Sequence, residues 1–135
     1  MKGALLDTHA LWWLLGGEVR FGREASRIVR AALGSGELAV SAISFWEVAM
    51  LRSRQKLDLD TSVVAWRQQV LRLGIKEIVV SGDIGIAAVE LNGLHADPAD
   101  RIITATAALS NATLVTGDER ILAWSGDLRR QDVRR

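Results

Sequence analysis

Apolar and polar residues follow one another along the chain in blocks of two kinds. Short apolar runs bounded by turn residues predict strands, and these runs cover residues 1–6, 37–41, 75–81 and 113–116. Longer segments repeat apolar residues every three or four positions, which is typical of helices; they cover residues 10–15, 22–33, 45–54, 63–73, 83–92, 98–109 and 119–124. Because strands alternate with helices, the pattern predicts an α/β fold with a mostly parallel sheet that is covered on both faces.

The length of the chain sets the number of domains that we expect. Its 135 residues suffice for one domain with a substantial buried core. Hydrophobic residues make up 49% of the chain and charged residues 24%, as in ordinary globular proteins. The sequence contains no internal repeat, low-complexity tract or linker, so we expect a single domain over residues 1–135.

Cysteine content and charge exclude several classes of protein. The chain has no cysteine, which rules out disulfides and zinc–thiolate sites. Seventeen basic against sixteen acidic residues leave a net charge of +1, which argues against a strongly basic nucleic-acid coat. Asp7 and His9 interrupt the apolar start, so it does not match a signal peptide, and no run approaches about 18 apolar residues. We therefore expect a cytoplasmic protein that does not enter the membrane.

Four acidic residues stand where an α/β fold gathers its functional groups. Asp7 and Asp118 each follow an apolar strand, and the ends of neighbouring parallel strands open into one crevice. Glu47 and Asp100 lie near the starts of two strongly apolar helices. Buried carboxylates that lack cations repel one another and are costly to desolvate, and a divalent metal is the usual remedy. Oxygen ligands without His or Cys favour Mg²⁺ or Mn²⁺.

Each acid also has a purely structural explanation. Asp7 or Thr8 suits the N-cap of the helix that follows, and Asp118 suits a turn. Glu47 and Asp100 would oppose a helix dipole favourably. Taken singly, none of these positions decides between the two explanations; the four together favour a metal site. Two further groups are expected to be neighbours of the acids rather than ligands: Asp97 as a helix cap before Pro98, and the histidines His9 and His95.

Four stretches of the chain resemble the motifs of one family, in the same order and with similar spacing. They are LLDTHALWW (5–13), SAISFWEVA (41–49), HADPADRII (95–103) and LVTGDERI (114–121). Each is degenerate alone, but together they resemble the PIN-domain ribonucleases, and among them the VapC-type toxins of bacterial toxin–antitoxin pairs. The resemblance covers nearly the whole length. Gly117 departs from it, since many relatives have a larger residue there, and a glycine could loosen the loop that carries Asp118.

The resemblance implies a three-layer α/β/α sandwich and a Mg²⁺ or Mn²⁺ site. The implied metal ligands are Asp7, Glu47, Asp100 and Asp118. Thr116 would form a hydrogen bond that orients Asp118, and Thr8 and Asp97 would support the acids from nearby. The implied activity is hydrolysis of RNA phosphodiester bonds by metal-activated water.

Three other functions compete with the ribonuclease. A haloacid-dehalogenase-type phosphatase needs a second acid two residues after Asp7, where this chain has His9. A receiver-type phosphoacceptor module needs paired acids after its first strand and a late lysine, and neither is evident. The remaining alternative is a catalytically silent PIN module that acts by binding RNA or protein.

Basic and aromatic residues suggest where RNA and protein partners bind. One candidate RNA-binding patch follows Glu47 and consists of Arg52, Arg54 and Lys56. A second lies in the tail and consists of Arg129, Arg130, Arg134 and Arg135, although a disordered tail is the favoured interpretation there. The resemblance also implies a cognate antitoxin, which we expect near Trp12 and Trp13, and a homodimer. Most of the five tryptophans are expected in the core.

Overall fold

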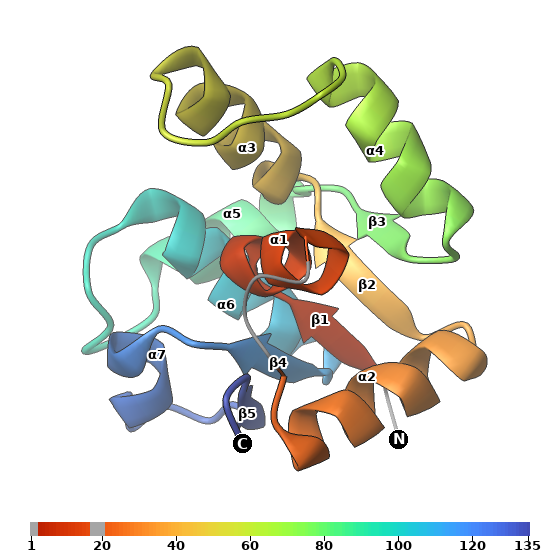
Figure 1. Ribbon diagram of the computed structural model, residues 1–135. Coiled ribbons are helices and arrows are strands. Elements are labelled where there is room, and N and C mark those ends of the chain that lie inside the picture. Colours follow the sequence, from red (N-terminus) through yellow and green to blue (C-terminus); the bar gives the residue numbers. More distant parts are fainter. Residues whose placement is uncertain (1–2, 17–20) are drawn as a thin grey trace.

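A single sheet forms the centre of the molecule. The computed structural model describes residues 3–16 and 21–135. Within them, five strands pair side by side in the order β3-β2-β1-β4-β5, and every neighbouring pair is parallel (Figure 1). The strands are β1 (Ala4–Leu6), β2 (Leu38–Ser41), β3 (Lys76–Ile78), β4 (Thr113–Thr116) and β5 (Arg130–Asp132). The expected α/β class is confirmed, and the described sheet is parallel throughout rather than mostly so.

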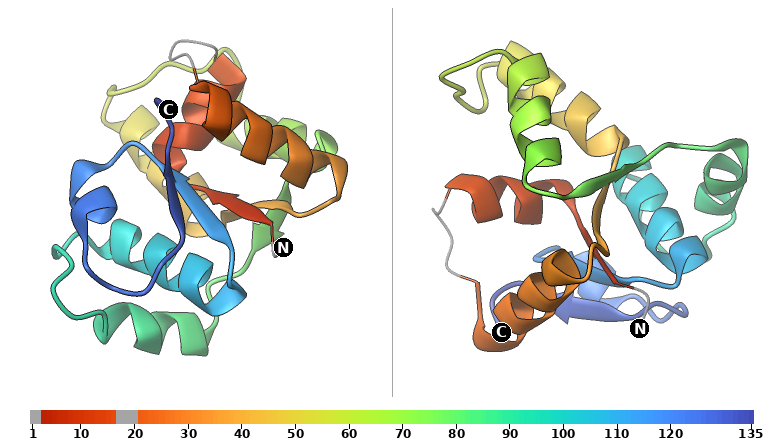
Figure 2. Two further views of the ribbon diagram at one scale, coloured as in Figure 1. Left: turned by 90° about the horizontal axis from the view of Figure 1, so that it is seen from below. Right: turned by 90° about the vertical axis from the view of Figure 1, so that its right-hand side faces the viewer.

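Helices cover both faces of the sheet. Those in the described residues are α1 (Thr8–Gly16), α2 (Arg23–Gly34), α3 (Ile43–Ser53), α4 (Val63–Arg72), α5 (Gly82–Val89), α6 (Pro98–Ser110) and α7 (Glu119–Ala123). Side chains of α1 to α4 pack on one face and those of α6 and α7 on the other, with α5 against α6. Figure 2 shows the helices on the two sides of the sheet. The expected three-layer sandwich is therefore present. None of the described helices combines the length and apolar character that a bilayer-spanning helix requires.

The central strand β1 explains why the chain begins with an apolar run. Ala4 and Leu6 point into the core beneath α1 to α4, whereas Leu5 points into the core beneath α6 and α7. Both leucines are fully buried, because a central strand of a parallel sheet has no face in contact with water. Successive side chains of a strand alternate between its faces, so one short segment contributes to both cores.

The pairing of β1 with β4 places two distant segments of the chain at the same edge. Leu6 is in register with Val115, and the backbone N–H of Asp7 donates to the carbonyl of Val115 at 3.1 Å. The residues that follow both strands therefore leave the sheet together. This register brings Asp7 close to the β4–α7 connection, as a parallel neighbour relation requires.

Several element boundaries differ from those predicted. The strand expected over 75–81 is only Lys76–Ile78, and Val79 is 68% exposed. β3 lies at the edge of the sheet, and its pairing with β2 ends where the chain enters α3, so the apolar residues beyond Ile78 have no partner strand. α1 starts at Thr8, two residues earlier than predicted. The predicted stop at Gly16-Gly17 lies partly outside the described residues.

The charged C-terminal segment is ordered, so the favoured interpretation of a disordered tail was wrong. Residues Arg130–Asp132 form β5, which pairs with β4. The Arg130 guanidinium donates to four backbone carbonyls, those of Ile121, Trp124, Gly126 and Leu128. It also lies over the Trp124 ring, 5.9 Å from its centroid. Arg130 therefore fastens the tail to α7 and is not available as part of an RNA-binding patch.

Replacing Arg130 by alanine should destabilise the protein. The Arg130→Ala variant leaves four carbonyls without their charged donor, and we expect a loss of about 2–4 kcal/mol in the free energy of unfolding. Urea unfolding followed by circular dichroism measures it. Arg30→Ala, which removes an exposed arginine of α2, is the matched control and should change stability little. Equal stability of the two variants would contradict the fastening role.

Candidate metal centre

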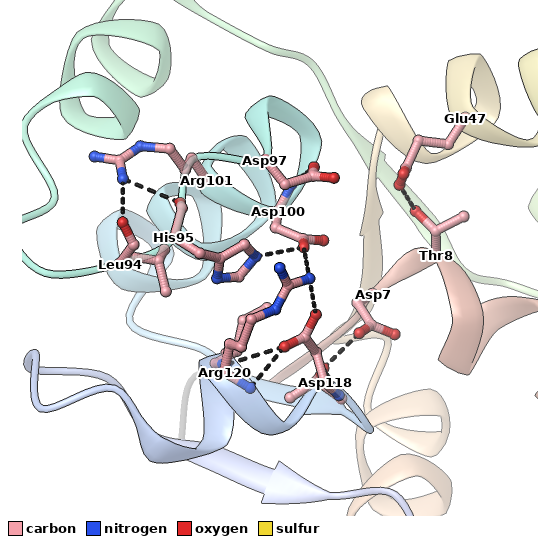
Figure 3. A network of polar contacts seen from close by, with 12 residues as sticks. Asp7, Thr8, Glu47, Leu94, His95, Asp97, Asp100, Arg101, Asp118 and Arg120 are labelled. Atoms are coloured by element: carbon pink, nitrogen blue, oxygen red, sulfur yellow. Dashed lines mark hydrogen bonds and ion pairs between the residues drawn. The ribbon is translucent and has the colours of Figure 1, made fainter.

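An acidic pocket of about 320 Å³ opens at the carboxyl ends of β1 and β4. The described residues that line it are Asp7, His9, Trp13, Glu47, Asp97, Asp100, Gly117, Asp118 and Arg120. The four acids singled out in the sequence thus line the same pocket, although they come from segments up to 111 residues apart (Figure 3). Five carboxylates face one arginine there, so the pocket carries a strong negative charge.

Asp7 is the most deeply buried of these acids, with 5% of its surface exposed. One carboxylate oxygen, Oδ1, accepts the backbone N–H of Ala10 at 2.8 Å and so caps α1. The other oxygen, Oδ2, accepts a hydrogen bond from the Thr116 hydroxyl. Asp7 therefore does cap the helix, as its structural explanation proposed, and it also faces the pocket.

Thr116 links the two strand ends through a single hydroxyl. Its Oγ1 donates to Asp7 and accepts the backbone N–H of Asp118 at 3.0 Å. The sequence suggested that Thr116 orients Asp118, and it does contact that residue, through the backbone rather than the carboxylate. The bond to Asp7 was not anticipated.

Glu47 enters the pocket from α3, where it is held by Thr8. The Thr8 hydroxyl donates to Glu47 Oε1 and is also hydrogen-bonded to the Ser44 hydroxyl at 2.9 Å. The sequence left open whether Asp7 or Thr8 caps α1. Asp7 is the cap, and Thr8 is not. Thr8 instead ties α1 to α3, which fixes the distance between two of the acidic segments.

The start of α6 supplies the third acid. Asp97 is the N-cap of this helix and accepts the backbone N–H of Asp100 at 3.0 Å, with Pro98 at the first helical position, as predicted. Oδ2 of the Asp100 carboxylate lies 2.7 Å from Nε2 of His95. Within the described part of the chain the buried Nδ1 of His95 has no partner. A ring that donates its Nε2–H to the carboxylate accounts for this contact.

Arg101, to which no sequence pattern pointed, fixes the segment that carries His95. Its guanidinium donates to five backbone carbonyls at the end of α5 and in the connection between α5 and α6; Figure 3 draws the bonds to Leu94 and His95. They belong to Ala88, Val89, Leu91, Leu94 and His95. The connection is thereby held against α6. No periodicity in the sequence signals a side chain that binds loop carbonyls.

Asp118 caps α7 and meets an arginine that was also not singled out. Its Oδ1 accepts the backbone N–H groups of Arg120 at 2.8 Å and Ile121 at 3.2 Å. Its Oδ2 lies 3.3 Å from Arg120 Nη2, which is in turn 3.8 Å from Asp100 Oδ2. Figure 3 shows Arg120 reaching between these two carboxylates.

The environment raises the pKa of three acids and lowers that of the fourth. Burial raises the pKa of Asp7 to about 6, against the opposing effect of its hydrogen bonds from Thr116 and Ala10. Burial, reinforced by neighbouring negative charges, also raises the pKa of Glu47 and of Asp100. Burial opposes ionisation of Asp118 as well, but the hydrogen bonds from Ile121 and Arg120 outweigh it, and its pKa is lowered. Among the described residues that line the pocket, Arg120 alone offsets these carboxylates with a permanent positive charge.

The donor set fits a hard divalent cation. One ligand atom each from His95, Asp100 and Asp118 lie within 4.8 Å of one another, and Asp7 and Glu47 line the same pocket. Carboxylate oxygens are the ligands that Mg²⁺ and Mn²⁺ prefer. Burial is the main cause of the raised pKa of Asp100 and Glu47, and a cation there would offset the neighbouring negative charges that add to it.

Gly117 permits close packing beside Asp118 rather than loosening the loop. A Cβ atom at this position would lie 3.2 Å from atoms of Trp13, Val133 and Arg134. The Arg134 guanidinium also donates to the Gly117 carbonyl at 3.1 Å. The space that a side chain would need is therefore already filled, which holds the loop in place.

The two neighbouring tryptophans of α1 face different pockets. Trp13 lines the acidic pocket together with His9, and the centroids of the two rings are 5.7 Å apart. Trp12 contacts Trp66 instead, and both line a separate cavity of about 380 Å³ between α1, α4 and the segment before α4. Trp66 is buried, whereas Trp46 is 55% exposed. The basic residues Arg54 and Lys56 are exposed just beyond α3.

Comparison with known proteins agrees with this geometry. Ribonuclease VapC22 of Mycobacterium tuberculosis (strain ATCC 25618 / H37Rv) is 34% identical over 122 residues, which are 90% of this chain and 91% of that protein. A toxin–antitoxin complex from Klebsiella pneumoniae contains a chain that is 26% identical, with a TM-score of 0.57 and coverage of 90% of this chain and 91% of that one.

A second solved structure shares the fold. VapBC-1 from nontypeable Haemophilus influenzae superposes with a TM-score of 0.65 over 96% of both chains, at 20% identity. The family model for the PIN domain matches residues 4–125, nearly the whole chain. The resemblance inferred from the four motifs is therefore confirmed: the chain belongs to the PIN-domain family.

Proposed function

We propose that the protein is a metal-dependent endoribonuclease of the VapC type, the toxin of a toxin–antitoxin pair. The observation that carries this proposal is the convergence of Asp7, Glu47, Asp100 and Asp118 on one pocket with little positive charge. The 34% identity to a protein named Ribonuclease VapC22 supports the same activity. Residues 1–135 would act as one domain and in the cytoplasm, where RNA is accessible.

The four acids would hold one or two Mg²⁺ or Mn²⁺ ions. When bound, such an ion activates water and stabilises negative charge on the phosphate and on the leaving oxygen. The chain's own residues orient the carboxylates: Thr116 holds Asp7, Thr8 holds Glu47, and His95 holds Asp100. Asp97 contributes through the backbone of Asp100, whose N–H it accepts. Such partners fix the ligands before the ion arrives.

The RNA would be bound through its backbone by the basic residues that follow α3. Arg52 lies in the last turn of that helix, and Arg54 and Lys56 are exposed next to it. Glu47 belongs to the same helix, so this patch and the acidic pocket are joined by a rigid element. Of the tail residues, Arg130 is fully engaged with carbonyls, which makes the α3 patch the better candidate.

A cognate antitoxin and a second copy of the chain are the protein partners that we propose. One solved relative is a toxin–antitoxin complex with 26% identity to this chain. The cavity beside Trp12 and Trp66 offers aromatic surface for an antitoxin segment, whereas Trp13 lies at the acidic pocket. Exposed Trp46 adds further aromatic surface next to Glu47. A homodimer stays a prediction that size-exclusion chromatography can test.

A silent module that only binds RNA or protein is the alternative function. Such a module does not need carboxylates whose pKa values are raised, and these groups are retained here with their hydrogen-bond partners. Turnover on a panel of RNAs, with Mg²⁺ or Mn²⁺ and with excess chelator, separates the alternatives.

Replacing any one of the four acids by its amide should abolish metal-dependent RNA cleavage while the fold is kept. We expect kcat/KM to fall by more than about a hundredfold, because even groups that merely orient a metal ligand contribute about 10- to 100-fold. Asp127→Asn, which alters an exposed carboxylate elsewhere, is the matched control and should retain activity. Full activity of Asp7→Asn, or activity in excess chelator, would remove the metal mechanism.

Metal-free protein should become more stable as the pH falls from 7 to 4, because Asp7 binds its proton more tightly when folded. Its pKa is raised from 3.8 to about 6, so the stabilisation is complete below the lower value and is lost as the pH rises through the higher one. This difference corresponds to about 3 kcal/mol. Urea unfolding in chelator should show the pH dependence in the wild type but much less of it in Asp7→Asn. Identical pH profiles would contradict the burial of an ionisable Asp7.

Charge removal from the α3 patch should weaken RNA binding and reduce its salt dependence. In an Asp7→Asn background that prevents cleavage, alanine at Arg52, Arg54 and Lys56 should lower the slope of log K against log salt by up to about 2. Alanine at Arg23, Arg27 and Arg30, which removes as many charges from α2, serves as the control. Equal slopes for the two triple variants would show that the α3 patch does not contact phosphate.

A further inference from the structure

Arg120 is a cation placed inside an otherwise acidic pocket. Among the described residues that line the pocket, five carry carboxylates and only Arg120 carries a permanent positive charge. Its position follows from α7, which begins directly after Asp118 and turns the Arg120 side chain back over its own N-cap. The guanidinium is therefore built into the site by local structure and does not arrive there from a distant surface.

The guanidinium and a metal ion would use the same two carboxylates, those of Asp100 and Asp118. Arg120 Nη2 lies 3.3 Å from Asp118 Oδ2 and 3.8 Å from Asp100 Oδ2 (Figure 3). These two carboxylates, together with His95, form the group of ligand atoms that could surround one cation. Because Asp118 Oδ1 is engaged by the N-terminus of α7, Oδ2 is the oxygen left for either partner. Binding of one cation therefore competes with binding of the other.

Arg120 is held only loosely in this position. Its side chain is 63% exposed, and both contacts are longer than the separation of about 2.8 Å that is typical of strong ion pairs. Exposed pairs of this kind contribute little stability. Arg101 and Arg130 differ sharply, since each guanidinium donates to four or more backbone carbonyls. Of these three arginines, Arg120 is the one whose side chain can leave its partners at low cost.

We propose that Arg120 is a built-in competitor of the divalent ion, an inference that rests on the proposed metal-dependent ribonuclease function. In the metal-free protein it partners Asp100 and Asp118 and reduces their repulsion. A bound divalent ion would use these carboxylates, and Arg120 would then leave them. The guanidinium, kept at the rim of the pocket by α7, then binds a phosphate of the RNA, since its planar fork matches phosphate oxygens.

Mn²⁺ titration by calorimetry tests the competition without any need for turnover. Arg120→Ala should bind Mn²⁺ about three- to fivefold more tightly than the wild type, the gain expected from removing a weak competing pair. Arg120→Lys, which keeps the charge, should stay closer to the wild type. Arg30→Ala is the matched control, because it removes the same charge from an exposed side chain of α2 that does not line the pocket. It should leave the Mn²⁺ affinity unchanged.

Steady-state cleavage at saturating Mn²⁺ tests the second half of the proposal. Arg120→Ala should raise the KM for RNA, whereas Arg30→Ala on α2 should not. Equal Mn²⁺ affinities of Arg120→Ala and wild type would overturn the competition, and an unchanged KM would overturn the phosphate contact. If the folded wild type itself bound neither Mn²⁺ nor Mg²⁺, the proposed metal-dependent function would fail along with the inference. If the wild type bound the metal but Arg120→Ala changed neither the Mn²⁺ affinity nor the KM, only the inference about Arg120 would be refuted, and the proposed function would stand.

Discussion

The hydrogen bond between Thr116 and Asp7 is the interaction on which the site depends. It joins the ends of the two central strands, and the same hydroxyl holds the backbone of Asp118. Its existence requires that β1 and β4 be parallel neighbours in the observed register, with Leu6 opposite Val115. The buried carboxylate, the sheet order and the position of the last acid are therefore one coupled arrangement, and a shift in any of them would disturb the others.

The pocket is electrostatically uneven, and this unevenness follows from the elements that bear each acid. Asp7 comes from the central strand and is almost fully buried, so its charge is the most costly. Asp118 comes from a connection near the surface, where backbone N–H groups and Arg120 stabilise its charge. The deep part of the pocket thus lacks a cation that the protein itself could supply. An external divalent ion held by the acids that line the pocket would supply it.

The sequence predicted those features that depend on local patterns. Apolar runs located β1 and β4, and the acids that follow them were correctly expected to share a pocket. Features that depend on single polar contacts between distant segments were not predictable. β5 has no strand-like composition and is ordered through pairing with β4 and the carbonyl contacts of Arg130. Arg101 and Arg120 were missed because arginine spacing does not reveal which oxygens a guanidinium will meet.

Capping and metal binding, which the sequence offered as competing explanations, are compatible in the structure. Asp7 uses one oxygen to cap α1, and Asp118 uses one to cap α7, which leaves a second oxygen of each near the pocket. Asp97 caps α6 and thereby fixes the backbone of Asp100. A cap is a directional constraint, because the N–H groups of a helix end admit the carboxylate in only a narrow range of orientations. The helix ends therefore orient the carboxylates. Helix capping, the structural explanation of these acids, is thus the physical reason why they are placed to bind a metal.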